Sequence, residues 1–118
     1  MAKFEGLDKF MKWAENAPNE LSDEVKKVVT KTAYQIEATS KSLAPVSTGN
    51  LRRSITTNIK DDGEESIVAE VGTNVEYAIH VEYGTSKQSA QPFLNSAYLQ
   101  HKDKFEKAMN DAVKGVGE

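Results

Sequence analysis

The sequence predicts an α+β fold in which a small antiparallel sheet packs against a long helix from the first half of the chain and a C-terminal helix. Two observations lead to this expectation. Apolar residues recur at helical spacing over residues 19–43 and again after residue 92. Between these segments, apolar and polar residues alternate in two runs separated by a short turn, which is the pattern of a β-hairpin.

Two helices are expected before the hairpin. A short amphipathic helix is predicted over residues 3–16, from the spacing of Phe4, Leu7, Phe10, Met11, Trp13 and Ala14. The long helix, residues 19–43, has one apolar stripe made of Leu21, Val25, Val28, Val29, Thr32, Ala33, Ile36, Ser40 and Leu43. Acidic residues near its start complement the helix dipole, and Pro45 ends it.

The hairpin is expected over residues 51–71. The first strand is predicted from Leu51 to Ile59 because apolar and β-branched residues alternate there with polar ones. The sequence DDGEE (61–65) forms an acidic turn, and residues 67–71 form the return strand.

The segment from Tyr77 to Tyr83 fits two structures. Tyr77, Ile79, Val81 and Tyr83 alternate as in a strand, whereas Ala78 and the pair Val81-Glu82 fit two helical turns, and periodicity cannot decide so short a run. Residues 84–91 contain no large apolar side chain and read as a mobile loop. A last helix starts at Pro92 and ends near Lys114 and Gly115.

Length and composition restrict the class of protein. The 118 residues fit a single domain over 1–118, with residues 1–18 as an N-terminal helical arm and 19–114 as the core. No apolar run approaches the length of a membrane span, and the first residues lack the apolar core of a secretory signal. The chain has no cysteine, which excludes disulfides, thiol catalysis and cysteine zinc sites.

The distribution of charge argues against a nucleic-acid-binding module. The net charge is −3, and the whole acidic excess lies within residues 44–92. A nucleic-acid-binding surface needs a basic stripe, and Arg52-Arg53 is the only adjacent basic pair that nearby acids do not dilute. We expect one of these arginines to be solvated and the other to pair with an acid across the hairpin, for example Glu70.

Few residues suggest catalysis or metal binding. His80 and Glu82 would share a face on a strand, like a general base and its orienting carboxylate, but no nucleophile accompanies them, so we favour an exposed polar face. His101 lies on the apolar stripe of the last helix and is expected to be packed and hydrogen-bonded. The turn 61–65 lacks the spacing of a calcium loop. We therefore expect no catalytic residue, no metal and no cofactor.

Two segments together resemble a known family. APVSTGNLRRSI (44–55) looks like a proline–Thr-Gly–Leu-Arg-x-Ser signature, and VGTNVEYAIHVEYGTSKQSAQPFLNSA (71–97) looks like a second signature that ends in Pro-Phe-Leu and a helix. The chain thereby resembles the head–tail joining, or tail-completion, proteins of long-tailed bacteriophages and prophages, also called HK-ninety-seven gene-product-ten-like minor structural proteins. The matching positions are Pro45, Thr48, Gly49, Leu51, Arg53, Ser54, Gly72, Tyr77, Ala78, Glu82, Tyr83, Gly84, Thr85, Pro92, Phe93, Leu94 and Ala97. Ser47 stands where an Asp is usual and Ser96 where a Pro is common.

The resemblance implies a structural virion protein rather than an enzyme. Such proteins assemble as rings, commonly hexamers, between the head connector or adaptor and the tail tube or tail terminator. They would act in the virion at the head–tail interface after assembly in the host cytoplasm, with no membrane and no nucleic acid except DNA passing through the ring. The resemblance also implies a short helix over Tyr77–Tyr83. Its pattern includes Glu82, whose partner, a backbone amide or an Arg, the sequence alone does not identify.

Three segments are expected to make the assembly contacts. They are the turn at Asp61, Asp62, Glu64 and Glu65, the loop containing Ser86, Lys87 and Gln88, and the loop around Ser47–Arg53. Polar loops of this kind can become ordered on contact with a neighbour. Two other functions stay open at this point: a nucleic-acid-associated prophage protein, and a small hydrolase that uses His80 and Glu82.

Overall fold

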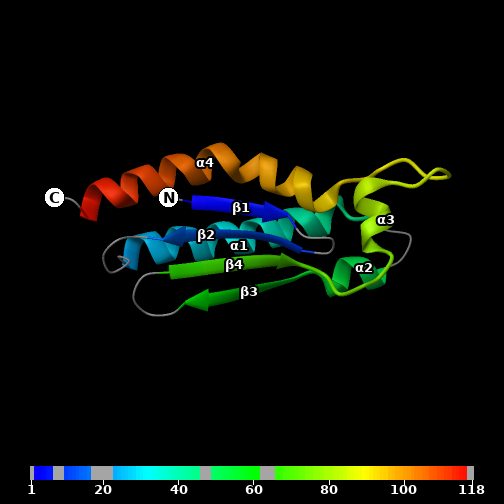
Figure 1. Ribbon diagram of the computed structural model, residues 1–118, viewed down its shortest axis with the longest axis horizontal. Coiled ribbons are helices and arrows are strands. Elements are labelled where there is room, and N and C mark those ends of the chain that lie inside the picture. The colour runs from blue at the N-terminus through cyan, green and yellow to red at the C-terminus, as the bar shows by residue number, and fades with distance from the viewer. Residues whose placement is uncertain (1, 7–9, 17–22, 46–48, 62–65, 117–118) are drawn as a thin grey trace.

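A computed structural model describes residues 2–6, 10–16, 23–45, 49–61 and 66–116, and of residues 2–6, 10–16, 66 and 113–116 it describes the backbone alone. The elements in chain order are β1 (Ala2–Gly6), β2 (Phe10–Asn16), α1 (Asp23–Leu43), α2 (Gly49–Ser54), β3 (Thr56–Asp61), β4 (Ser66–Gly72), α3 (Ala78–Tyr83) and α4 (Phe93–Val116). The four-stranded sheet and the long helices α1 and α4 run along the same axis, and α2 and α3 lie at one end (Figure 1). The fold is therefore α+β, as predicted.

The sheet has the strand order β1-β2-β4-β3 with every neighbouring pair antiparallel. Its register forms rows of residues that share a face. One row runs through Phe4, Trp13, Ala69 and Ile59, and the positions of Ala69 and Ile59 mark the face towards the helices, because Ala69 is buried and Ile59 packs against the core. The other face carries polar positions on β3, which fits an antiparallel sheet with one side open to water.

The prediction of a helix over residues 3–16 is wrong, because strands β1 and β2 occupy this range. The apolar residues that suggested helical spacing also fit two short strands, since Phe4 lies opposite Trp13 and Gly6 lies opposite Met11. Gly6 is a poor helix residue and ends β1. Pairing with β2 also satisfies the backbone groups along one side of β4, which a free N-terminal helix would leave unpaired.

The hairpin is confirmed, but its first strand begins later than predicted. Residues Gly49–Ser54 form helix α2, and strand β3 starts at Thr56. Leu51 and Ile55 are both fully buried and four residues apart, which is the spacing of one helical turn. The alternation that predicted a strand from Leu51 was therefore produced by a helical turn followed directly by a strand.

The long helices supply most of the core. The buried residues of α1 repeat at three- and four-residue spacing, as predicted, and they are Val25, Val29, Thr32, Ala33, Ile36 and Ser40. Phe93, Leu94, Ala97, Phe105 and Met109 on α4 pack against the same core. Leu43, which was assigned to the stripe of α1, is exposed. Among the described residues, no helix has both the length and the apolar character of a membrane span.

Candidate functional site

The segment that fitted both helix and strand forms helix α3 (Ala78–Tyr83). Its buried residues Ala78, Val81 and Glu82 lie at helical spacing, so the face they form contacts the core. This agrees with the structure that the family resemblance implied. Helix α3 stands at the end of the molecule where α4 begins, beside α2, and the polar segment 84–91 projects from it beyond the rest of the fold (Figure 1). Residues 84–91 are called the finger below.

Glu82 joins α3 to the start of α4. Its Oε1 accepts a hydrogen bond from the backbone N–H of Leu94 at 2.9 Å, and its Oε2 accepts one from the N–H of Asn95 at 3.1 Å. These N–H groups lie in the first turn of α4 and have no partner within that helix. A carboxylate at this place also complements the helix dipole. Glu82, which is only 6% exposed, therefore acts as a cap delivered from another helix.

The environment of Glu82 shifts its acidity. Burial disfavours the charged carboxylate and raises the pKa of Glu82 above its ordinary value of 4.5, whereas the hydrogen bonds from Leu94 and Asn95 act in the opposite direction and are the smaller effect. Both carboxylate oxygens of Glu82 are thus hydrogen-bonded to backbone amides at a buried position. His80 lies two residues earlier on the same helix and is exposed. Two positions apart on a helix do not face each other, so the pair has no general-base arrangement.

The finger is a small hairpin whose backbone is held at several points. The N–H of Thr85 donates to the carbonyl of Gln88 at 2.8 Å, and the N–H of Gln91 donates to the carbonyl of Val81 at 2.7 Å. Gly84 has φ +78°, and a Cβ on it would lie 2.7 Å from the nitrogen of Ala90. Only glycine adopts this conformation and leaves this space. The segment that its composition predicted to be mobile is thus hydrogen-bonded, while every residue from Thr85 to Gln91 is exposed.

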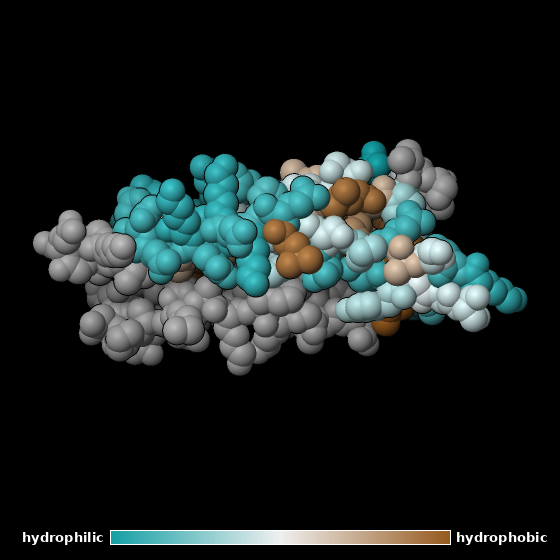
Figure 2. Space-filling view, turned by 90° about the horizontal axis from the view of Figure 1, so that it is seen from above, coloured by the Kyte–Doolittle hydropathy of each residue, from teal (hydrophilic) through white to brown (hydrophobic). Residues whose placement is uncertain are grey.

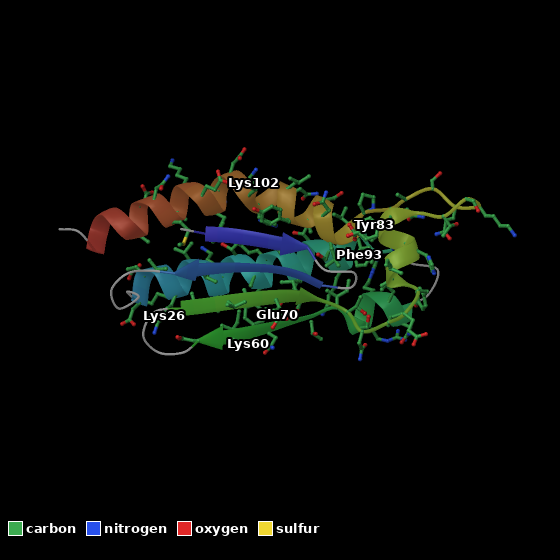
Figure 3. The ribbon with its side chains drawn as sticks, in the orientation of Figure 1. Lys26, Lys60, Glu70, Tyr83, Phe93 and Lys102 are labelled. Carbon is green, nitrogen blue, oxygen red and sulfur yellow. The ribbon has the colours of Figure 1, made fainter. Side chains whose placement is uncertain are left out.

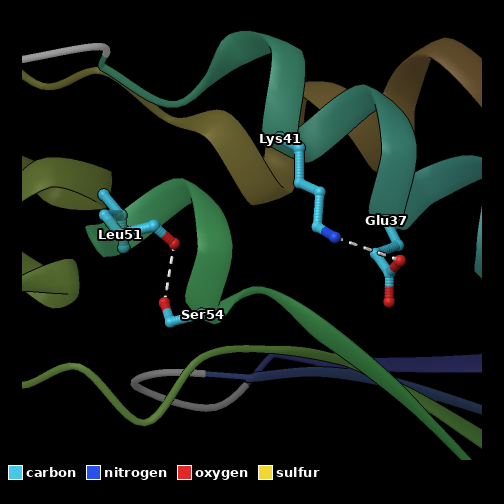
Figure 4. Close-up of polar contacts among 4 residues, drawn as sticks. All are labelled: Glu37, Lys41, Leu51 and Ser54. Atoms are coloured by element: carbon cyan, nitrogen blue, oxygen red, sulfur yellow. Dashed lines mark hydrogen bonds and ion pairs between the residues drawn. The ribbon is translucent and has the colours of Figure 1, made fainter. Parts of the chain in front are cut away.

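The two sequence signatures meet at a hydroxyl pair. Ser54, the last residue of α2, donates its hydroxyl to the carbonyl of Leu51 at 2.6 Å (Figure 4) and also contacts the hydroxyl of Thr73 at 2.5 Å. Thr73 in turn accepts a hydrogen bond from the N–H of Val75 at 3.0 Å. The contact fixes the end of the first signature to the turn that leads from β4 into α3. Thr73 follows Gly72 in the second signature, but no pattern in the sequence indicated that these two hydroxyls would meet.

The arginine pair sits beside this junction. Arg52 donates from its guanidinium to the carbonyl of Ala44 at 3.1 Å, and the Arg53 side chain is exposed. The predicted pairing of one arginine with Glu70 is wrong, because Glu70 lies 2.8 Å from the ammonium of Lys60 on the adjacent strand (Figure 3). The reason is the helix: with residues 49–54 in α2, neither arginine lies on the hairpin. Arg52 instead ties α2 to the end of α1.

A shallow cavity of about 370 Å³ lies between α2 and α3 at the base of the finger. Leu51, Tyr77, Val81 and Gln91 contribute to its walls. Seen from above, the surface over the C-terminal part of α4 is hydrophilic, and the apolar patches lie nearer the end that carries the finger (Figure 2). Tyr83, 62% exposed and directly before the finger, belongs to the large apolar residues that reach the surface. Figure 3 labels Tyr83, the last residue of α3, and the buried Phe93, the first residue of α4, close to each other.

The segments expected to make contacts lie at opposite ends of the molecule. Helix α2 and the finger, with Ser86, Lys87 and Gln88 all exposed, occupy one end, and β3 finishes at Asp61 towards the other end (Figure 1). Asp61 forms an ion pair of 3.3 Å with Lys26 of α1. Asp62, Glu64, Glu65, Ser47 and Thr48 lie outside the described residues.

The other candidate chemical groups have structural surroundings. His101 is hydrogen-bonded through Nε2 to the hydroxyl of Thr39 at 2.8 Å, which confirms a packed histidine that links α4 to α1. In the part of the chain that the structure describes, no three metal-binding side chains come together. The hydrogen bonds around α3 thus join this helix to the start of α4 and hold the exposed finger.

Comparison with known families agrees with this. A family model described as "Bacteriophage HK97-gp10, putative tail-component" matches residues 8–84, which is more than half of the chain. The chain belongs to this family of phage tail components. The match includes the first signature and the second as far as Gly84, and it stops before the rest of the finger and α4. No match was found among curated proteins or among solved structures.

Proposed function

We propose that the protein is a structural component of a tailed-phage virion that completes the tail and joins it to the head by assembling as a ring at their interface. Membership in a family of phage tail components supports the general role. The ring, with six copies as the expected number, and the position between the head connector or adaptor and the tail tube or terminator are the proposal's own content. DNA would pass through the ring without being bound in a groove.

The observation that carries the proposal is the anchoring of the finger. An exposed polar segment adds little to the stability of the subunit that bears it, yet this one is fixed on both sides. The cap by Glu82, the hydrogen bond from Gln91 and the conformation of Gly84 all act within this short stretch. Ordered polar loops on a rigid scaffold are where binding residues concentrate in proteins. A stiff finger suits docking into a neighbouring subunit with little loss of chain entropy.

The positions of the proposed contact segments also support an assembly in which neighbouring subunits meet through two different surfaces. The finger and α2 lie at one end, with Arg53 and Lys87 exposed, and strand β3 finishes at Asp61 towards the other end. A ring needs two different complementary patches on each subunit. The hydrolase alternative has less support, because both carboxylate oxygens of Glu82 accept hydrogen bonds from the start of α4, and Glu82 is buried whereas His80 is exposed.

The proposal is tested by electron microscopy of lysates from a phage or prophage lacking this gene. The expected result is an accumulation of DNA-filled heads and separate tails of normal length, with joined particles restored when the gene is supplied from a plasmid. Joined virions in the absence of the protein would contradict the proposal. Empty heads as the only product would assign the protein to an earlier step, such as DNA packaging, and would contradict it as well.

A further inference from the structure

Both edges of the sheet lack a partner strand within the described chain. The order β1-β2-β4-β3 leaves β1 at one edge and β3 at the other. Figure 1 shows these two strands at opposite edges of the sheet, with β3 furthest from α4. An edge strand presents a row of unpaired N–H and C=O groups that can pair with a strand of another chain.

The exposed residues of the β3 edge are polar, which favours pairing with a specific strand over non-specific pairing. Thr56, Asn58 and Lys60 are exposed and lie on the side of the sheet away from the helices, since the alternate residue Ile59 packs against the core. A polar edge with a lysine resists indiscriminate pairing. Pairing at such an edge depends on backbone hydrogen bonds with a partner strand of the right direction and register.

The sheet itself offers a partner strand of the right direction. All three pairings are antiparallel and there are four strands, so β1 and β3 run in opposite directions. A second copy placed beside the first in the same orientation therefore brings its β1 antiparallel to β3, and the hydrogen-bonding pattern of the sheet continues across the junction. With an odd number of strands, the same placement would give a parallel junction.

The register also continues. Phe4, Trp13, Ala69 and Ile59 form one row across the sheet, so the next position in that row is Phe4 of a second copy. This register places the whole of β1 against Thr57–Asp61 and keeps every residue on its own face. A slip of one residue would exchange the two faces, whereas a slip of two would preserve them.

We propose that the subunits of the ring join by continuing the sheet, with β1 of one copy pairing antiparallel with β3 of the next. This inference rests on the proposed ring and names the contact that builds it. It uses two different patches on each copy, so the contact can repeat around a ring. Strand β1 precedes the residues matched by the family model, so this contact is not part of what defines the family.

Disulfide cross-linking tests the contact directly, because the natural chain contains no cysteine. Glu5 and Asn58 occupy the ends of another row, through Lys12 and Glu70, on the open face of the sheet. Within one copy, β1 and β3 are three strand spacings apart, about 14 Å, which is too far for a disulfide. A bond in the double variant E5C/N58C can therefore form only between copies.

In the experiment, the double variant is supplied to the deletion strain and virions are assembled under reducing conditions. The virions are then mildly oxidised, and their proteins are separated by electrophoresis without reductant. The expected result is a ladder of dimers and higher multiples, from E5C/N58C or from the two-residue shift E5C/K60C. The matched control is the double variant E5C/T57C. Its two cysteines lie on opposite faces of the sheet, so it should give no ladder. Each single variant should also stay monomeric.

The outcomes separate this contact from the proposed function. Joined virions that contain either face-preserving double variant but give no ladder would overturn the sheet contact and leave head–tail joining intact. Dimers from the single variant N58C would also overturn it, in favour of a symmetric contact between two β3 strands. If the wild-type gene fails to restore joining to the deletion, the proposed function fails, whatever the cross-linking of the purified protein shows.

Discussion

Replacing Glu82 with alanine should destabilise the fold through the start of α4. The substitution removes both acceptors, at 2.9 Å from the N–H of Leu94 and 3.1 Å from the N–H of Asn95. Leu94 is only 4% exposed, so water replaces the lost bond poorly there, whereas Asn95 is exposed. Loss of a helix cap costs about 0.5–2 kcal/mol, and an unsatisfied buried donor costs about 1–3 kcal/mol. Because removal of a buried charge relieves its desolvation, we expect a loss of about 2 kcal/mol in the free energy of unfolding.

Urea unfolding followed by circular dichroism measures this loss. The matched control is His80→Ala, which changes an exposed position on the same helix and should alter stability by about 0.5 kcal/mol at most. Glu82→Gln keeps one carbonyl acceptor and should fall between the control and Glu82→Ala. If Glu82→Ala proves as stable as His80→Ala, the cap does not hold α3 to α4 and the account of the joint is refuted.

The pH dependence of Glu82 has a defined sign. Its pKa is raised from 4.5 by burial, so the folded state binds this proton more tightly than the unfolded state does. Its contribution to stability is then complete below the unfolded pKa and declines as pH rises through the raised pKa. The wild type should therefore lose stability relative to Glu82→Gln as pH increases from about 4 to neutrality. A relative gain over that range would show that the amide hydrogen bonds outweigh burial.

Three further changes probe the finger and the hydroxyl junction. Gly84→Ala should cost about 1–3 kcal/mol in urea unfolding, since an alanine at φ +78° is strained, whereas the control Gly49→Ala meets only the flexible end of Arg53 and should cost far less. Thr73→Val removes the contacts with Ser54 and the N–H of Val75 and should lower the free energy of unfolding by about 1–2 kcal/mol. Thr73→Ser keeps the hydroxyl and should retain most of that stability. Equal stability of the two variants would contradict the role of the hydroxyl. Lys87→Glu changes an exposed position and should not alter the free energy of unfolding. If the finger docks on an acidic neighbour, the variant should reduce head–tail joining at least about tenfold when it is supplied from a plasmid to the deletion. Unchanged joining would show that the charge of Lys87 does not contribute to the contact.

The long helices were predictable because their apolar stripes extend over several turns. Val25, Val29 and Ile36 repeat often enough to define one face of α1, and only the helical period fits them. Pro45 and Pro92 marked where the neighbouring segments change. The return strand β4 was predicted for a related reason, since Ile67, Ala69 and Val71 alternate with other residues and are all buried.

The errors arose in segments too short for a period to be distinguished. Residues 2–6 and 10–16 form two strands, and the apolar residues of both together imitated a helical stripe. Leu51 belongs to α2 and Ile59 to β3, so the alternation crossed from one element into the next. Sheet pairing, which joins residues far apart in sequence, decided both cases.

The site was predictable in part. The signature containing Glu82, Gly84 and Phe93 located the joint, but the partner of Glu82 could not be read from the sequence because Leu94 and Asn95 contribute backbone N–H groups, which any residue type could provide. The same holds for the finger, since its hydrogen bonds join main-chain atoms of Thr85, Gln88, Gln91 and Val81. Gly84, by contrast, signalled through its residue type the positive φ that the structure has.

The most direct measurement of the central claim is a joining reaction with purified parts. DNA-filled heads and separate tails from the deletion lysate are mixed with the purified protein, and joined particles are counted by electron microscopy and by plaque formation. The account predicts that joining rises with added wild-type protein and stays low when Glu82→Ala is added at a urea concentration that unfolds only the variant. Heads and tails that join equally well without the protein would contradict its role at the head–tail interface.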